Sequence, residues 1–266
     1  MSALQPVSLP NPPLMEQSFD VRVGLPADVW HAHVLAGAPE RVQATGSAAL
    51  DAQLPGGGWP VGAMTELLQS AHVHSEWRLL LPALGACGQG PVVLVGAPHL
   101  PFAPALAAQG LHSQRLLSVG AGAGPGSDRL WATEQALRCA AVDAVLLWLP
   151  PGAVRTDQLR RLQMAAASHH KLLFVMRDAQ ARTDASPAVL RLEVGPVSPK
   201  QGPQGPVVDA LEVRLLKRRG PPHDQPLHLN AFTPRLGMLL AATRQANKVH
   251  LSGPAPHALA RTAQRA

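Results

Sequence analysis

The chain of 266 residues contains no tyrosine, and phenylalanine and tryptophan together make up only 3% of it. Cysteine is equally scarce. Cys87 and Cys139 are the only two, which excludes a disulfide framework and a four-cysteine zinc site and is typical of a reducing compartment. Charged residues account for 15% and hydrophobic residues for 46%, a balance that excludes disorder over the whole length. The composition therefore indicates a globular protein of one large domain or two small ones.

Charge is also absent from a long internal stretch, because no Asp, Glu, Lys or Arg lies between Arg78 and Arg115. Five prolines interrupt this stretch: Pro82, Pro91, Pro98, Pro101 and Pro104. A membrane span needs about 20 continuous apolar residues, so none is predicted here. The first residues show no basic region before an apolar run, which argues against a secretory signal. We therefore expect a cytoplasmic protein without a membrane partner.

The charges that are present are spread unevenly. Residues 1–70 hold six acids and two arginines, whereas residues 212–266 hold nine bases and two acids. This asymmetry predicts that the basic part contacts non-specific DNA or an acidic protein, and the alternative is a solubilising surface. Lys217, Arg218 and Arg219 are the candidate contacts, since such side chains grip phosphate oxygens without reading sequence; the alternative is a solvated sheet edge.

From residue 63 onward, strand-like and helix-like runs alternate. Predicted strands cover 64–68, 92–95, 116–119, 142–149, 172–176, 207–216 and 227–230. Predicted helices cover 76–86, 103–109, 128–140 and 156–168. Such alternation predicts an α/β fold with a mostly parallel central sheet covered by helices on both faces.

The flanking segments differ in composition from this core. Residues 1–25 are rich in proline and predict a flexible arm, and the core domain is expected to span 26–232. Within it, residues 195–206 contain three glycines and four prolines, which predicts a mobile loop. Residues 233–266 are expected to form a basic tail that begins as a helix and ends in disorder.

One set of motifs resembles a known family. The turn Thr45-Gly-Ser-x-x-Leu-Asp51, the glycines 56–58 and the Pro60-x-Gly62 step before a strand are similar to the approach to the nucleotide site in RecA-type ATPases. The variant Pro55-Gly-Gly-Gly-Trp-Pro60 more particularly resembles ImuA, a RecA-related family of accessory proteins in bacterial damage-induced mutagenesis. The segments 146–150 (LLWLP) and 215–222 (LLKRRGPP) also look like that family. The resemblance implies a RecA-like P-loop fold over about residues 27–223.

The expected nucleotide site departs from the RecA pattern in three places. A working P-loop needs glycines, a lysine and a hydroxyl around the phosphates, but the stretch 68–78 has neither glycine nor lysine and places Glu76 near the phosphate position. Trp148 stands where a magnesium-associated acid belongs, and Pro98 where a catalytic glutamate belongs. These departures predict a pseudo-ATPase with no catalytic residue, cofactor or metal. The alternative is a rearranged ATPase site using His74, Ser75 and Arg78.

The resemblance implies a non-catalytic adaptor in SOS-induced translesion DNA synthesis. Its implied partners are a polymerase-like ImuB protein, a DnaE-type polymerase and RecA, and its oligomeric state is open. The alternatives are a weak DNA-dependent ATPase or recombinase modulator and an SOS cell-division inhibitor.

Two further groups of residues are candidates for binding. Trp59 lies in the glycine-rich loop, where we expect it to be exposed and to anchor a protein partner. Trp77 and Trp131, on predicted helices, are expected to fill a core or groove. His72 and His74 could offer two ligands to a metal, but lone loop histidines are the commoner case.

Overall fold

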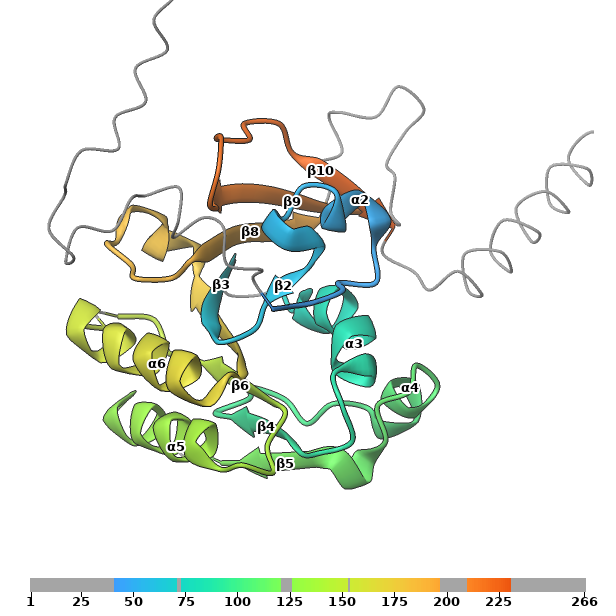
Figure 1. The fold of residues 1–266 in the computed structure, drawn as a ribbon, viewed down its shortest axis with the longest axis vertical. Coiled ribbons are helices and arrows are strands. Elements are labelled where there is room, and N and C mark those ends of the chain that lie inside the picture. The colour runs from blue at the N-terminus through green and yellow to red at the C-terminus, as the bar shows by residue number, and fades with distance from the viewer. Residues whose placement is uncertain (1–40, 71–72, 121–125, 153, 197–209, 231–266) are drawn as a thin grey trace, which may run out of the picture. The chain divides into compact units, whose positions relative to one another are not determined.

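The computed structural model describes residues 41–70, 73–120, 126–152, 154–196 and 210–230. The predicted arm (1–25) and tail (233–266) lie outside these ranges, as does most of the predicted loop at 195–206. The described residues form an α/β fold in which a mixed, mostly parallel sheet of eight strands is flanked by helices (Figure 1). The predicted fold class is confirmed at this level.

The strands of the sheet follow the order β10-β9-β8-β3-β7-β6-β4-β5. They are β3 (Ala63–Gln69), β4 (Val92–Val95), β5 (Leu116–Val119), β6 (Ala144–Trp148), β7 (Leu172–Asp178), β8 (Leu190–Pro196), β9 (Ala210–Lys217) and β10 (Leu227–Asn230). All pairs from β8 to β5 are parallel, whereas β9 and β10 add an antiparallel edge. The carboxyl ends of β3, β6 and β7 therefore lie at one edge of the sheet.

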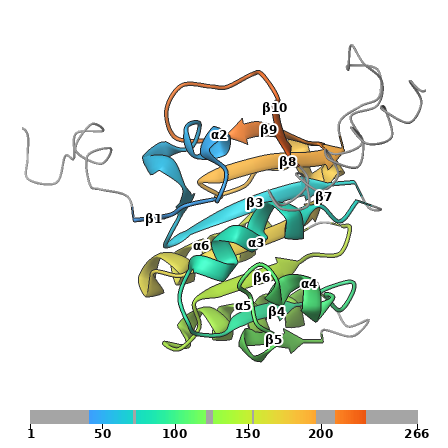
Figure 2. The ribbon, with the colours of Figure 1, turned by 90° about the vertical axis from the view of Figure 1, so that its right-hand side faces the viewer.

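Helices cover both faces of the sheet. Helix α3 (Glu76–Ala86) lies on one face, and α5 (Gly126–Arg138) and α6 (Thr156–His169) lie on the other (Figure 1); Figure 2 looks onto the α3 side. The side chains of β4 alternate accordingly. Val92 and Leu94 join the apolar cluster of α3, and Val93 and Val95 join that of α5 and α6. Strand β4 thus contributes to two cores. The short helix α4 (Ala103–Ala107) precedes β5.

A small hairpin precedes the sheet. It pairs β1 (Val42–Gln43) with β2 (Trp59–Pro60), and the connection holds α2 (Ala48–Asp51) and a 3-10 turn, η1 (Pro55–Gly57). Gly57 has φ +81°, a conformation that favours glycine, and a Cβ on Gly58 would lie 2.5 Å from the backbone oxygen of Gln43. These glycines are therefore needed for the backbone conformation and the close strand contact of the hairpin.

Most predicted elements are present, with ends shifted by a few residues. Helix α3 and strands β4, β5 and β10 have the predicted bounds. Strand β8 was not predicted. It continues through Gly195 and Pro196, so the prediction that a loop begins at residue 195 was wrong. No helix within the described ranges combines the length and the apolarity that crossing a membrane requires.

Candidate functional site

The turn that resembles the RecA-type approach is stabilised by its own residues. The Thr45 backbone N–H donates to Oδ1 of Asp51 at 2.9 Å, and the Ser47 N–H donates to the Thr45 hydroxyl at 3.0 Å. Gly46 has φ +85° and lies so close to Pro82 of α3 that a Cβ would be 2.4 Å from the proline ring. The Thr-Gly-Ser-x-x-Leu-Asp pattern thus forms a closed turn that packs on α3.

Open α/β sheets bind ligands at the carboxyl edge of their parallel strands, and here Gln69 lies at the end of β3 on that edge. Its Oε1 accepts a hydrogen bond from the Ser75 backbone N–H at 2.8 Å, and its Nε2 donates to Oε2 of Glu76 at 3.1 Å. Glu76 begins α3, where the helix dipole favours a negative charge. The helix start that would otherwise offer N–H groups to an anion is therefore occupied by a carboxylate of the chain itself.

Trp148, the last residue of β6, reaches the same carboxylate from the other side. Its Nε1 donates to Oε1 of Glu76 at 3.2 Å, and its ring lies 6.2 Å from that of Trp77. Glu76 and Trp148 are only 2% and 7% exposed. Both carboxylate oxygens thus accept a hydrogen bond from a neutral donor in a buried cluster of Gln69, Ser75, Glu76 and Trp148, which we call the Glu76 cluster.

His74 lies on the solvent side of the Glu76 cluster. Its Nδ1 is 3.8 Å from Oε1 of Glu76, and its ring meets that of His99 edge-on at a centroid distance of 5.0 Å. His74 and Ser75 are consecutive residues just before α3, and Arg78 lies exposed on that helix. His72 is outside the described residues, so the two-histidine metal hypothesis stays untested.

The chemistry open to the Glu76 cluster is limited by its own hydrogen bonds. The Ser75 N–H, which a phosphate would use, is already donated to Gln69. A carboxylate with both oxygens engaged in a buried position is poorly placed to act as a general base, because it cannot reach a substrate proton without breaking those bonds. The arrangement therefore suits a structural closure of this edge better than catalysis.

A second buried carboxylate, which the sequence analysis missed, lies on the opposite face of the sheet. Glu66 of β3 is fully buried; its Oε1 accepts from Nη1 of Arg177 at 3.3 Å and its Oε2 from Nε of Arg191 at 2.7 Å. Arg177 also pairs with Asp184 at 2.7 Å, and Arg191 donates to the backbone oxygen of Ala181 at 2.8 Å. We call these residues the Glu66 cluster. Single charges within apolar strands were the signal that could have revealed it.

The three candidate DNA contacts lie at the end of β9 and directly after it, and Lys217 and Arg218 donate hydrogen bonds to backbone oxygens of the chain. Lys217 Nζ donates to the backbone oxygen of Ser186 at 3.0 Å. Arg218 donates to the backbone oxygens of Gln53 and of Pro221, the latter at 2.9 Å. Arg219 is exposed. Arg218 therefore ties the turn after α2 to the end of β9, in addition to any contact it makes with a ligand.

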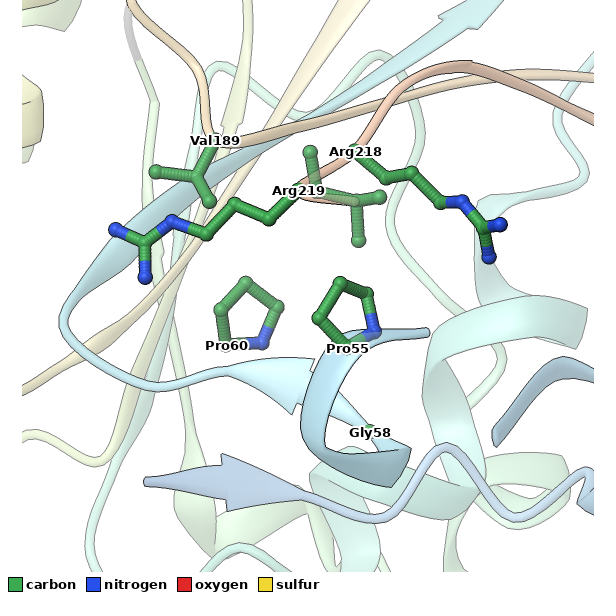
Figure 3. A pocket seen from close by; sticks show the side chains of 7 residues that line it. Pro55, Gly58, Pro60, Val189, Arg218 and Arg219 are labelled. Carbon is green, nitrogen blue, oxygen red and sulfur yellow. The ribbon is translucent and has the colours of Figure 1, made fainter. Parts of the chain in front are cut away.

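The basic run borders a small pocket shown in Figure 3. Its lining consists of Pro55, Gly58, Pro60, Val189, Leu190, Arg218 and Arg219. The rings of Pro55 and Pro60 lie next to each other, and the two arginine side chains extend in opposite directions (Figure 3). The tertiary structure thus places the basic run beside the glycine-rich hairpin. The arginines diverge from this pocket, so it does not concentrate positive charge in one place.

Two expectations about tryptophan were wrong. Trp59 is fully buried and meets Phe174 edge-on at a centroid distance of 5.5 Å, because strand β2 places its side chain in the apolar cluster on the α3 face of the sheet. It therefore cannot anchor a partner in this conformation. Trp131, expected to fill a core or groove, is 65% exposed on α5.

No protein-family model matches the chain, and no curated protein was found to be similar to its sequence.

Proposed function

We propose that this chain is a non-catalytic, RecA-like accessory protein of damage-induced translesion DNA synthesis, similar to the ImuA family. In this role it joins a polymerase-like ImuB protein and a DnaE-type polymerase in the cytoplasm and recruits them to damaged DNA. RecA is a further expected partner. The chain contributes binding surfaces, and the polymerase contributes the chemistry.

The observation that carries this proposal is the position of Glu76. A P-loop protein has a strand, a glycine-rich loop and a helix whose start holds the phosphates. Here β3 and α3 supply the strand and the helix, but the helix start holds the Glu76 carboxylate, fastened by Gln69 and Trp148. A phosphate would meet like charge and would have to displace two buried hydrogen bonds. The resemblance in the preceding turn and hairpin favours a RecA-type ancestor that lost nucleotide use.

Calorimetric titration with Mg·ATP, with and without single-stranded DNA, tests the loss of nucleotide use. We expect no binding tighter than about millimolar, a free energy of about −4 kcal/mol, and no hydrolysis. Micromolar ATP binding, or hydrolysis stimulated by DNA, would contradict the proposal and favour the alternative of a weak DNA-dependent ATPase.

Co-expression with a polymerase-like ImuB protein tests the adaptor role. We expect the two proteins to purify together through an affinity step and gel filtration. The matched control is a Lys217→Ala/Arg218→Ala/Arg219→Ala variant, which tests whether the basic run supports this contact. Absence of any complex with the unchanged chain would contradict the adaptor role, whatever the nucleotide result.

A further inference from the structure

A groove runs between α5 and α6 on the side of these helices away from the sheet. Its lining consists of Glu134, Arg138, Arg161, Met164, Ala165, Ser168 and His169. Met164 is 62% exposed although it is a large apolar side chain. The groove therefore combines an apolar wall with basic groups.

The two arginines of the groove are held by one buried carboxylate. Oε1 of Glu134 accepts from Nη2 of Arg138 at 2.6 Å, and Oε2 accepts from Nη2 of Arg161 at 2.7 Å. The Glu134 side chain is 11% exposed, whereas those of Arg138 and Arg161 are 56% and 70% exposed. A guanidinium has five N–H donors, and Glu134 takes one from each arginine. Glu134 thus fixes two guanidinium groups from different helices at one spot, with donors left for a ligand.

The exposed Trp131 extends the same surface. Trp131, Glu134 and Arg138 are spaced i, i+3 and i+7 on α5, and Arg161, Met164 and Ser168 have the same spacing on α6, so each set follows one side of its helix. Seven residues of helix span about 10 Å. The surface between two such rows of side chains is therefore about as long as two turns of a third helix.

We propose that the α5–α6 groove binds an acidic amphipathic helix of a partner protein. The carboxylates of that helix pair with Arg138 and Arg161, and its aliphatic side chains pack on Met164 and Trp131. Tryptophan, methionine and arginine are the residue types that interfaces between proteins favour. A nucleic acid fits less well, because a phosphate backbone needs a row of cations, whereas here two guanidinium groups meet at Glu134 beside the exposed Met164. The inference does not depend on the partners proposed above.

Fluorescence anisotropy with a labelled synthetic peptide tests this surface on the full chain. The probe is a helical peptide of about 14 residues, with leucine on one face and glutamate on both flanks. The control probe has the same composition in scrambled order. We expect the helical probe to bind at least about tenfold more tightly than the scrambled one.

Variants locate the binding. Arg138→Glu/Arg161→Glu should weaken the helical probe at least about tenfold, and a probe with lysine in place of glutamate should bind this variant better than it binds the unchanged chain. Met164→Ser, which removes the apolar side chain and adds no charge, should also weaken binding. Arg214→Glu is the matched control, since Arg214 is an exposed arginine paired with Glu212 on β9; it should bind as the unchanged chain does.

Three results would overturn the proposal. The first is equal binding of the helical and scrambled probes, or binding of neither. The second is undiminished binding of the acidic probe by both groove variants, with far-ultraviolet circular dichroism and melting temperature showing that they are folded. The third is binding of a single-stranded oligonucleotide of about 20 nucleotides that the groove variants lose while the peptide does not bind, which would assign the groove to nucleic acid.

Discussion

Glu66 and Glu76 are buried carboxylates on opposite faces of the sheet, 0% and 2% exposed, but their partners differ in charge. Glu66 meets two arginines, and Asp184 balances the second positive charge of the Glu66 cluster. The hydrogen bonds of Glu76 come from the neutral side chains of Gln69 and Trp148. Glu76 is also the first residue of α3, where the helix dipole favours a negative charge. Glu66 is thus paired with arginines inside the fold, whereas the two side chains that donate to Glu76 carry no charge.

The largest expected effect is that of Glu66→Ala. The substitution leaves Arg177 and Arg191 buried with no carboxylate between them, so we expect the free energy of unfolding to fall by roughly 3–5 kcal/mol. Urea denaturation followed by circular dichroism measures it.

The control for Glu66→Ala removes the whole buried cluster. Glu66→Leu/Arg177→Met/Arg191→Leu should recover most of the lost stability, because apolar side chains of similar volume replace all three charges. A triple variant less stable than Glu66→Ala would show that the cluster contributes more than charge compensation.

A smaller loss is expected for Glu76→Ala. It removes the acceptor from Gln69 Nε2 and Trp148 Nε1, which are neutral donors, so the expected cost is about 1–3 kcal/mol. The same denaturation experiment compares it with Glu66→Ala. Equal or greater destabilisation by Glu76→Ala would break the distinction between the two carboxylates.

Trp148→Phe should have a smaller effect again. The substitution keeps an aromatic ring against Trp77 but removes the indole N–H that donates to Glu76, for which about 0.5–1.5 kcal/mol is expected. Trp77→Phe is the matched control, since Trp77 packs against the same ring. If both variants lose equal stability, packing and not the hydrogen bond accounts for the effect of Trp148.

The smallest effect is expected at Asp157, an exposed carboxylate that serves as a baseline. Its hydrogen bond with Arg155 holds the pKa of Asp157 below its ordinary value, so any stabilisation is present at neutral pH and is lost as the pH falls through the folded-state pKa. Because exposed pairs contribute little, Asp157→Asn should leave the melting temperature unchanged at neutral pH. A nuclear magnetic resonance titration of Asp157 should show a midpoint below that of Asp in an unfolded peptide; an ordinary midpoint would contradict the pair.

Local patterns were sufficient to predict the fold class and most elements. Helix α3 and strands β4 and β5 were predicted with their observed bounds. For β4 the reason is that Pro91 and Gly96 bracket its short apolar run. Strand β8 was missed although its apolar residues alternate with Arg191 and Glu193, a pattern that is typical of a strand. Arg191 is buried, and its pairing with Glu66 and its hydrogen bond to the Ala181 backbone oxygen make a charge tolerable at that position.

The Glu76 cluster was predictable in part. The sequence indicated that Glu76 lies at the start of a helix and that Trp148 ends a strand. It did not indicate that the two are hydrogen-bonded, because 72 positions separate them along the chain. The placement of Trp59 failed for a related reason: a loop rich in glycine suggests exposure, but the hairpin turns this side chain against Phe174.

Short-range patterns in the sequence are enough to establish the alternation of strands and helices, the absence of a glycine-lysine phosphate cradle and the uneven distribution of charge, since these depend on neighbouring residues. Pairs of charges that are distant in the sequence required the tertiary structure. Glu66 meets Arg191 at a separation of 125 positions, and Glu134 of α5 meets Arg161 of α6 at a separation of 27 positions. Such pairs depend on strand order and helix packing, which short-range periodicity does not encode.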